Sequence, residues 1–345
     1  MPGVERLSRS AQPKTRFANR HTAAEHANAM RVAVIDIGSN TIKLLVAARS
    51  PAGGIETVHY AVEEARIGRG LGGVRPTLGT DSMERGAAAV ARLLALARTF
   101  SPGATVLVAT SAVRDAANGR EFAARLLRET GLAVRILAGK EEADYIGRGL
   151  AADPALAGAQ DFYLFDLGGG SLECLEFRAR RAAQSASAPL GCVRLTERFV
   201  ANPAEPFTAD NRAAIADAVQ REFAGAGNPL FRFALAAPAA AVATGGTVTT
   251  VRAMLVAQAG RPLAESDTSV GVTELEQLFA RIAPLPLDAR RAVPGLPAAR
   301  ADVFPSALAT ILEVARLAHV ERFTHSFYNL RYGIADELLG ASCGP

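Results

Sequence analysis

The feature that most constrains the fold is a strand–turn–strand unit that occurs twice, about 130 residues apart. Residues 32–46 are VAVIDIGSNTIKLLV, and residues 162–177 are FYLFDLGGGSLECLEF. In each copy an apolar run typical of a buried strand contains an aspartate near its end, passes through a glycine turn and continues as a second strand. The repetition predicts a duplicated α/β fold whose two similar halves face each other across a cleft.

The rest of the chain predicts alternating helices and strands around these two units. Asn118 and Glu121 have the spacing of a capping box, which predicts a helix that Gly131 ends. The Ala-, Asp-, Pro- and Gly-containing segment 151–160 is the expected boundary between a domain at 30–155 and a domain at 156–345. Further helices are expected at 80–100, 140–150, 191–200, 207–225, 247–258 and 302–319, and further strands at 54–66, 105–110, 133–137, 239–246 and 323–327.

Charge and cysteine content exclude several classes of protein. The net charge is +4, but residues 1–29 contain five basic and two acidic side chains, which leaves +1 for residues 30–345. A body this close to neutral does not favour duplex nucleic acid as a partner. No apolar run reaches the ~18–20 residues of a membrane span. Three cysteines without C-x-x-C spacing argue against a structural zinc site or a disulfide scaffold, and favour a reducing, cytoplasmic location.

Residues 1–29 are expected to lie outside the fold. Two interpretations remain open. The Arg-rich, acid-poor stretch is similar to a transit peptide, or Met30, directly before the first strand, is the true start.

The first glycine turn is a candidate phosphate site. Glycine lets backbone N–H groups approach a phosphate, and Ser, Asn and Thr add short donors. Asp36 cannot face a phosphate alone, but it can do so beside a hydrated Mg²⁺. The alternative is an ordinary hairpin turn. The candidate phosphate-binding residues of this turn are Gly38, Ser39, Asn40 and Thr41.

The second turn strengthens this interpretation, because three successive glycines lose more conformational entropy than a simple turn requires. Thr244–Thr247 adds a third glycine turn, which offers a helix N-terminus to the same cleft or is a tight strand–helix connection. The candidate phosphate-binding residues in these two turns are Gly168, Gly169, Gly170, Ser171, Gly245 and Gly246.

Seven segments in order, spread over residues 31–340, resemble the exopolyphosphatase / guanosine pentaphosphate phosphohydrolase (Ppx/GppA) family. The resemblance implies duplicated ribonuclease H-like domains of the actin-like, sugar-kinase-like ATPase superfamily, and a homodimer is an option by the same analogy. The chain resembles the short, two-domain members. The segments are IDIGSNT (35–41), ATSAVRDAANG (109–119), LAGKEEA (137–143), FDLGGGSLE (165–173), LGCVRLTERF (190–199), ATGGTVT (243–249) and RAD (300–302).

The resemblance also implies roles for individual residues. Glu142 matches the general base that positions the attacking water, with Glu141 as a competing candidate about 100° away around the helix. Asp166 and Glu173, together with Asp36, match positions that hold Mg²⁺ or Mn²⁺ and orient water. Arg114 matches a phosphate-clamping arginine, whose guanidinium fits phosphate geometry. The alternative for Arg114 is an ion pair with Asp115, and Lys43 is either a further cleft cation or a solvated strand residue.

The expected activity is Mg²⁺-dependent hydrolysis of terminal phosphate from inorganic polyphosphate. The close alternative is hydrolysis of pppGpp to ppGpp; a superfamily kinase and a non-catalytic sensor of polyphosphate or an alarmone are the more distant ones. Residues 68–73, GRGLGG, match the dinucleotide fingerprint G-x-G-x-x-G, but VRPTLGT follows where a helix must begin, so a loop is expected. Arg331-Tyr332-Gly333 stands where the family has Arg-Glu-Gly, and no role is assigned to this position.

Overall fold

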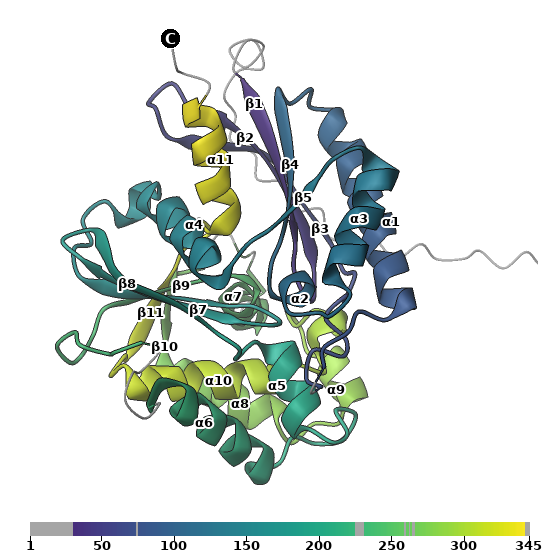
Figure 1. The fold of residues 1–345 in the computed structure, drawn as a ribbon. Coiled ribbons are helices and arrows are strands. Elements are labelled where there is room, and N and C mark those ends of the chain that lie inside the picture. The colour runs from purple at the N-terminus through teal and green to yellow at the C-terminus, as the bar shows by residue number, and fades with distance from the viewer. Residues whose placement is uncertain are drawn as a thin grey trace, which may run out of the picture.

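The computed structural model describes residues 30–73, 75–224, 231–258, 260–261, 263 and 266–341. The expectations for residues 1–29, and for the one of the three cysteines that stands at position 343, therefore lie outside the described residues. Two β-sheets with helices on their faces form the molecule (Figure 1), which confirms the α/β prediction.

The first sheet has five strands in the order β3-β2-β1-β4-β5. The β1–β2 and β2–β3 pairs are antiparallel, whereas β1–β4 and β4–β5 are parallel. The helices α1 (Thr80–Arg98), α2 (Ser111–Arg114) and α3 (Gly119–Thr130) belong to this part of the chain, which we call the first lobe. The strands are β1 (Arg31–Ile37), β2 (Ile42–Arg49), β3 (Ile55–Glu63), β4 (Ala104–Ala109) and β5 (Val134–Ile136).

The second sheet has six strands in the order β10-β11-β9-β6-β7-β8. With its outer helices it forms the second lobe. Its strands are β6 (Phe162–Leu167), β7 (Leu172–Arg178), β8 (Arg181–Ala188), β9 (Ala241–Thr244), β10 (Ser269–Gly271) and β11 (Arg322–His325). Its helices are α5 (Cys192–Phe199), α6 (Ala209–Ala224), α7 (Gly246–Gln258), α8 (Val272–Ile282), α9 (Leu287–Arg291) and α10 (Phe304–Leu317).

The two sheets share one topology, because β6, β7, β8, β9 and β11 pair with one another as β1 to β5 do. The registers also correspond: Asp36 lies opposite Lys43, and Asp166 lies opposite Glu173. Each hairpin is followed by a register shift at the matching place, after Val46 in one sheet and after Glu176 in the other. The duplication expected from the sequence is therefore confirmed, and each half carries an acidic residue at the same position of its hairpin.

A helical layer lies between the sheets and joins the lobes. It consists of α4 (Gly139–Ala151) and the last helix, α11 (Leu330–Ala341), which pack against each other (Figure 1). The helix α11 also packs against β1 and β2 of the first sheet, and α4 packs against β7 and β8 of the second. One apolar cluster contains Val32 and Val34 of the first sheet, Leu164 of the second, and side chains of both helices. The C-terminal end of the chain thus returns to the first sheet, where it can deliver side chains to the first hairpin.

Two further apolar clusters cover the outer faces of the sheets, under α1 and α3 in the first lobe and under α5 to α8 and α10 in the second. The helix α3 confirms the expected helix, and Gly131 ends it in the left-handed conformation with φ 75°. The capping box is wrong: the Asn118 side chain makes no cap hydrogen bond. Its Oδ1 accepts from Leu78 N at 2.9 Å and its Nδ2 donates to Leu78 O at 2.9 Å, so it anchors the preceding loop.

Candidate active site

Two glycine turns meet where the lobes face each other. The first turn is closed by a hydrogen bond from Gly38 N to Thr41 O at 3.2 Å, and the second by one from Gly168 N to Ser171 O at 3.0 Å. A Cβ added to Gly169 would lie 2.9 Å from Ser39 Cβ, and one added to Gly170 would lie 2.2 Å from Ser111 Oγ. The second and third glycines therefore also permit direct contact between the two turns, a reason for glycine that the sequence did not reveal.

Asp166 and Glu173 lie opposite each other on the second hairpin, where Glu173 is buried and Asp166 is partly buried. Burial raises the pKa of Asp166, and the charges of Lys43 and Arg331 oppose that rise. Burial also raises the pKa of Glu173 well above its usual range, and repulsion from Glu142 adds to the rise. Ser187 Oγ donates a hydrogen bond to Glu173 Oε1 at 2.8 Å. Carboxylates crowded in this way are well placed to receive a cation.

Glu142 lies in the first turn of α4, and its residue is only 5% exposed. Burial raises its pKa to about 7, the charge of Arg114 opposes the rise, and repulsion from Asp36 and Asp166 adds to it. Glu141 occupies a different position. Its carboxylate is exposed, accepts from Ala138 N at 2.9 Å and caps the start of α4. Of the two adjacent acids, the structure thus brings only Glu142 to the acidic cluster.

Arg114 connects this cluster to the first lobe. Its Nη1 donates to Glu142 Oε2 at 2.7 Å and to Leu137 O at 3.2 Å, and its Nε donates to Asp115 Oδ1 at 3.2 Å. The ion-pair interpretation of this arginine is therefore confirmed, and its role as a phosphate clamp stays a prediction. The ion pair with Asp115 exists, and the guanidinium also lies at the acidic cluster.

Arg331 is a residue of this site that the sequence analysis did not identify. It comes from the second position of α11, is buried, and its Nη1 lies 2.9 Å from Asp36 Oδ2. Its guanidinium also lies over the ring of Tyr60, with Cζ 5.4 Å from the ring centroid. The ion pair engages Oδ2 of Asp36. No signal in a single sequence placed the last helix beside the first hairpin.

The third glycine turn, Thr244–Thr247, packs closely against the carboxylate of Asp166. Gly245 has φ 87°, and a Cβ there would lie 2.1 Å from Asp166 Oδ1. Only glycine therefore fits beside this carboxylate. At Gly246, the first residue of α7, a Cβ would lie 2.0 Å from Nη1 of Arg300. The helix N-terminus that the sequence offered to phosphate thus faces an arginine.

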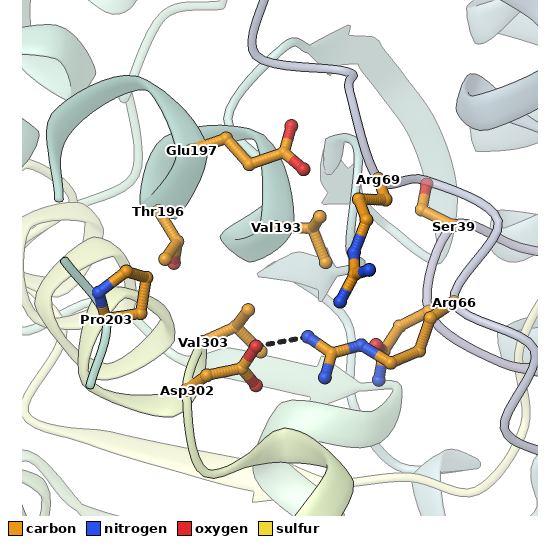
Figure 2. A pocket seen from close by; sticks show the side chains of 10 residues that line it. Ser39, Arg66, Arg69, Val193, Thr196, Glu197, Pro203, Asp302 and Val303 are labelled. Carbon is orange, nitrogen blue, oxygen red and sulfur yellow. Dashed lines mark hydrogen bonds and ion pairs between the residues drawn. The ribbon is translucent and has the colours of Figure 1, made fainter. Parts of the chain in front are cut away.

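A cavity of about 200 Å³ opens beside the first turn, between the lobes (Figure 2). Arg66 and Arg69 point into it, and Arg66 forms an ion pair with Asp302. Oδ1 and Nδ2 of Asn40 and Oδ1 of Asp302 are buried without a hydrogen-bond partner within the described part of the chain. The cavity is lined by Ser39, Asn40, Arg66, Arg69, Val193, Thr196, Glu197, Pro203, Asp302 and Val303.

Comparison with known proteins agrees with this arrangement. The family model of the Ppx/GppA phosphatase family matches residues 46–342. The chain belongs to this family. It is 32% identical to an uncharacterized protein of Streptomyces coelicolor over 276 residues, which are 79% of each chain.

Solved structures of Ppx/GppA proteins share the fold. An exopolyphosphatase from Cytophaga hutchinsonii superposes with a TM-score of 0.77 at 22% identity, over 90% of this chain and 98% of that one. A Ppx/GppA family member from Aquifex aeolicus gives 0.71 at 23% identity, over 92% and 99%. The actin-like architecture with two ribonuclease H-like halves, expected from the sequence, is confirmed.

Two features are absent from the described residues. No helix there is long and apolar enough to cross a bilayer. No three histidine, cysteine or carboxylate side chains there converge as ligands for a metal ion. The donor chemistry nevertheless suits Mg²⁺, which prefers oxygen and is held by one or two carboxylates while it keeps several waters.

Proposed function

We propose that this Ppx/GppA phosphatase hydrolyses the terminal phosphoanhydride bond of a phosphate chain, with inorganic polyphosphate as substrate and Mg²⁺ or Mn²⁺ as cofactor. The observation that carries the proposal is a buried carboxylate, Glu142, whose pKa is raised to about 7, beside Arg114 and near the carboxylates of Asp166 and Glu173. A base whose pKa lies near the working pH is suited to accept a proton from water.

Each part of the site has a task in this reaction. The turns at 38–41 and 168–171, with Gly245 and Gly246, bind phosphate oxygens when the lobes part, and Arg114 neutralises the terminal phosphoryl group. Glu142 orients a water in line and takes its proton as the new P–O bond forms, while the anhydride P–O bond breaks and the shortened chain leaves. Asp166, Glu173 and Asp36 are the residues that would hold the metal ion together with its waters, and the ion would supply charge neutralisation.

The second candidate substrate is pppGpp, which would be converted to ppGpp. The cavity at Asn40 favours it, because Oδ1 of Asn40 and Oδ1 of Asp302 there need N–H or O–H donors while Nδ2 of Asn40 needs an acceptor, so a ligand with both kinds of group fits. A nucleoside carries such donors, whereas an ionised inorganic phosphate chain does not.

Phosphate release from polyphosphate and from pppGpp, measured side by side, tests both candidates. Rapid turnover of pppGpp with no turnover of polyphosphate would select the second. Glu142→Gln is expected to lower kcat about 100- to 10,000-fold on the substrate used. Glu141→Gln, a change of the adjacent exposed acid, is the matched control and should retain activity. Equal turnover by both variants would show that Glu142 is not the base.

We also propose a cytoplasmic location.

A further inference from the structure

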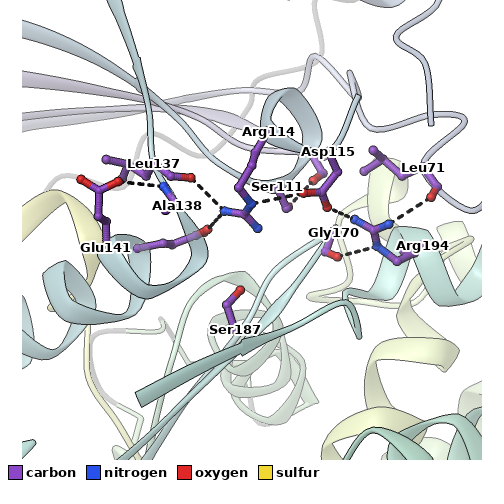
Figure 3. A network of polar contacts seen from close by, with 12 residues as sticks. Leu71, Ser111, Arg114, Asp115, Leu137, Ala138, Glu141, Gly170, Ser187 and Arg194 are labelled. Atoms are coloured by element: carbon purple, nitrogen blue, oxygen red, sulfur yellow. Dashed lines mark hydrogen bonds and ion pairs between the residues drawn. The ribbon is translucent and has the colours of Figure 1, made fainter. Parts of the chain in front are cut away.

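Arg194 of α5 contacts three separate parts of the molecule (Figure 3). Its Nε donates to Gly170 O of the second turn at 2.8 Å, and its Nη1 donates to Leu71 O at 3.2 Å. Its Nη2 forms an ion pair with Asp115 Oδ2. The side chain is 13% exposed, so these groups replace much of its hydration. All three nitrogens of the guanidinium are in use, which suits a planar fork of five donors.

Asp115 is held between two arginines. Its Oδ2 pairs with Arg194, and its Oδ1 accepts from Nε of Arg114. Nη1 of Arg114 in turn donates to Glu142. A continuous chain of charged hydrogen bonds therefore runs from α5 to the acidic cluster (Figure 3). Because each oxygen of Asp115 is engaged by a different arginine, losing Arg194 would free this carboxylate to rotate and to carry Arg114 with it.

The helix that carries Arg194 is attached to the second hairpin. Cys192 N donates to Gly168 O at 3.0 Å, and Val193 N donates to Gly169 O at 2.8 Å. Asp115 and Leu71, in contrast, belong to the first lobe. The contacts of Arg194 across the lobes therefore exist only while the two turns lie against each other.

The GRGLGG loop at 68–73 docks on the same helix. Glu197, almost one turn after Arg194, accepts Gly70 N on Oε1 and Gly72 N on Oε2, both at 2.8 Å. A Cβ on Gly72 would lie 2.7 Å from Glu197 Cβ, so glycine is needed for this approach. The loop that matched a dinucleotide fingerprint is thus a contact surface between the lobes. It also places the backbone oxygen of Leu71 where Arg194 donates to it.

We infer that Arg194 is a positioning residue: when the lobes close, it fixes Asp115 and thereby orients Arg114 toward the reacting phosphoryl group. The inference rests on the proposed function. The recorded contacts of Arg194 include neither Glu142 nor Asp166 nor Glu173, so it acts through Asp115. Closure of the lobes and the positioning of Arg114 are then coupled, because the residue that fixes Asp115 belongs to the second lobe.

Kinetics of Arg194→Met and Arg194→Lys test the catalytic part. Misplacing Arg114 by about 1 Å is expected to lower kcat about 100-fold in Arg194→Met, with little change in KM. Lysine restores the charge but not the fork, so Arg194→Lys should recover part of the loss. Arg198→Met, on the same helix, is the matched control, because Arg198 is exposed and lies over Phe199 rather than at the cluster. A fall in kcat equal to that of the control would overturn the inference.

A readout without substrate separates this inference from the proposed function. The Nε–H resonance of Arg114, assigned by its loss in Arg114→Lys, should be protected from exchange with water in the wild type. In Arg194→Met it should shift and exchange faster, whereas in Arg198→Met it should not change. An unchanged resonance in Arg194→Met overturns the positioning role whatever the activity is. A changed resonance with no turnover of either substrate by the wild type supports the positioning of Arg114 and refutes the proposed function.

Discussion

Burying Glu142 has a cost in stability that depends on pH. Burial raises the pKa of this carboxyl from 4.5 to about 7, against the opposing charge of Arg114. Between these values the folded protein holds a proton that the unfolded chain has released, so the free energy of unfolding falls as pH rises through this window. At 1.36 kcal/mol per pKa unit, the full effect is about 3 kcal/mol.

Glu142→Gln removes this cost. The glutamine oxygen still accepts a hydrogen bond from Arg114, and Arg114 keeps Asp115 as its charged partner. The variant has no proton to release at this position. We therefore expect it to match the wild type near pH 4.5 and to exceed it by about 3 kcal/mol at pH 8, where the wild type must ionise a buried group. For a chain of this size the gain corresponds to a Tm higher by about 5 °C.

Thermal unfolding in the presence of EDTA, followed by circular dichroism between pH 5 and 8, measures this difference. Circular dichroism suits the protein because the chain has no tryptophan. Glu141→Gln is the control with the opposite sign. Hydrogen bonding from Ala138 N, with help from Arg135, lowers the pKa of Glu141, so this carboxylate stabilises the fold above its usual pKa and its loss cannot raise Tm at pH 8. A Glu142→Gln protein no more stable than wild type at pH 8, or a gap that does not narrow toward pH 5, would refute the reasoning.

Three further outcomes are expected. Adding Mg²⁺ should raise Tm more at pH 8 than at pH 5, because the ion relieves repulsion among ionised acids, and Glu173→Gln should reduce that rise in the same melts. Arg331→Met should destabilise the protein by about 3–5 kcal/mol in urea titrations, because Asp36 is left buried and unpaired, while the double variant with Asp36→Asn should recover part of the loss. Gly149→Ala should lower the free energy of unfolding by about 1–3 kcal/mol, because its Cβ would lie 2.2 Å from the backbone oxygen of Asn329, directly before α11. Gly158→Ala should leave stability unchanged, because the space around Gly158 is open.

Local patterns were sufficient for the parts of the fold that depend on short segments. The two hairpins, their aspartates and the glycine turns follow from residues adjacent in the chain, and so does Glu142 at the start of α4. Family resemblance added the roles. The strands β8 and β10 and the helix α8 were not predicted. For β8 the reason is its composition: Arg181–Ala188 is rich in alanine and polar residues, and the second hairpin rather than the strand's own pattern decides its pairing with β7.

Contacts between distant segments could not be predicted from one sequence. Arg331 reaches Asp36 across 295 positions, and Arg194 reaches Asp115 across 79. Both arginines lie in segments that the resemblance had singled out, but only the packing of α11 and α5 shows which acids they meet. Asn118 gives the converse case. Its local spacing predicted a helix cap, but its side chain forms hydrogen bonds with the backbone of Leu78, 40 residues away in the chain, instead.

The lobes are joined by chemically different contacts on two sides of the hairpins. On one side, α4 and α11 fill an apolar layer whose residues are buried, and separating it would expose that surface to water. On the other side the contacts are polar and partly exposed: Arg66 with Asp302, Glu197 with the backbone of the 68–73 loop, and Arg194 with Asp115. Water can replace such contacts at small net cost. We therefore expect the polar side to be the one that opens when a phosphate chain enters between Ser39 and Gly169. Because Arg194 lies on that side, we expect its ion pair with Asp115 to break when the lobes part and to form again when they close, which would couple closure to the position of Arg114.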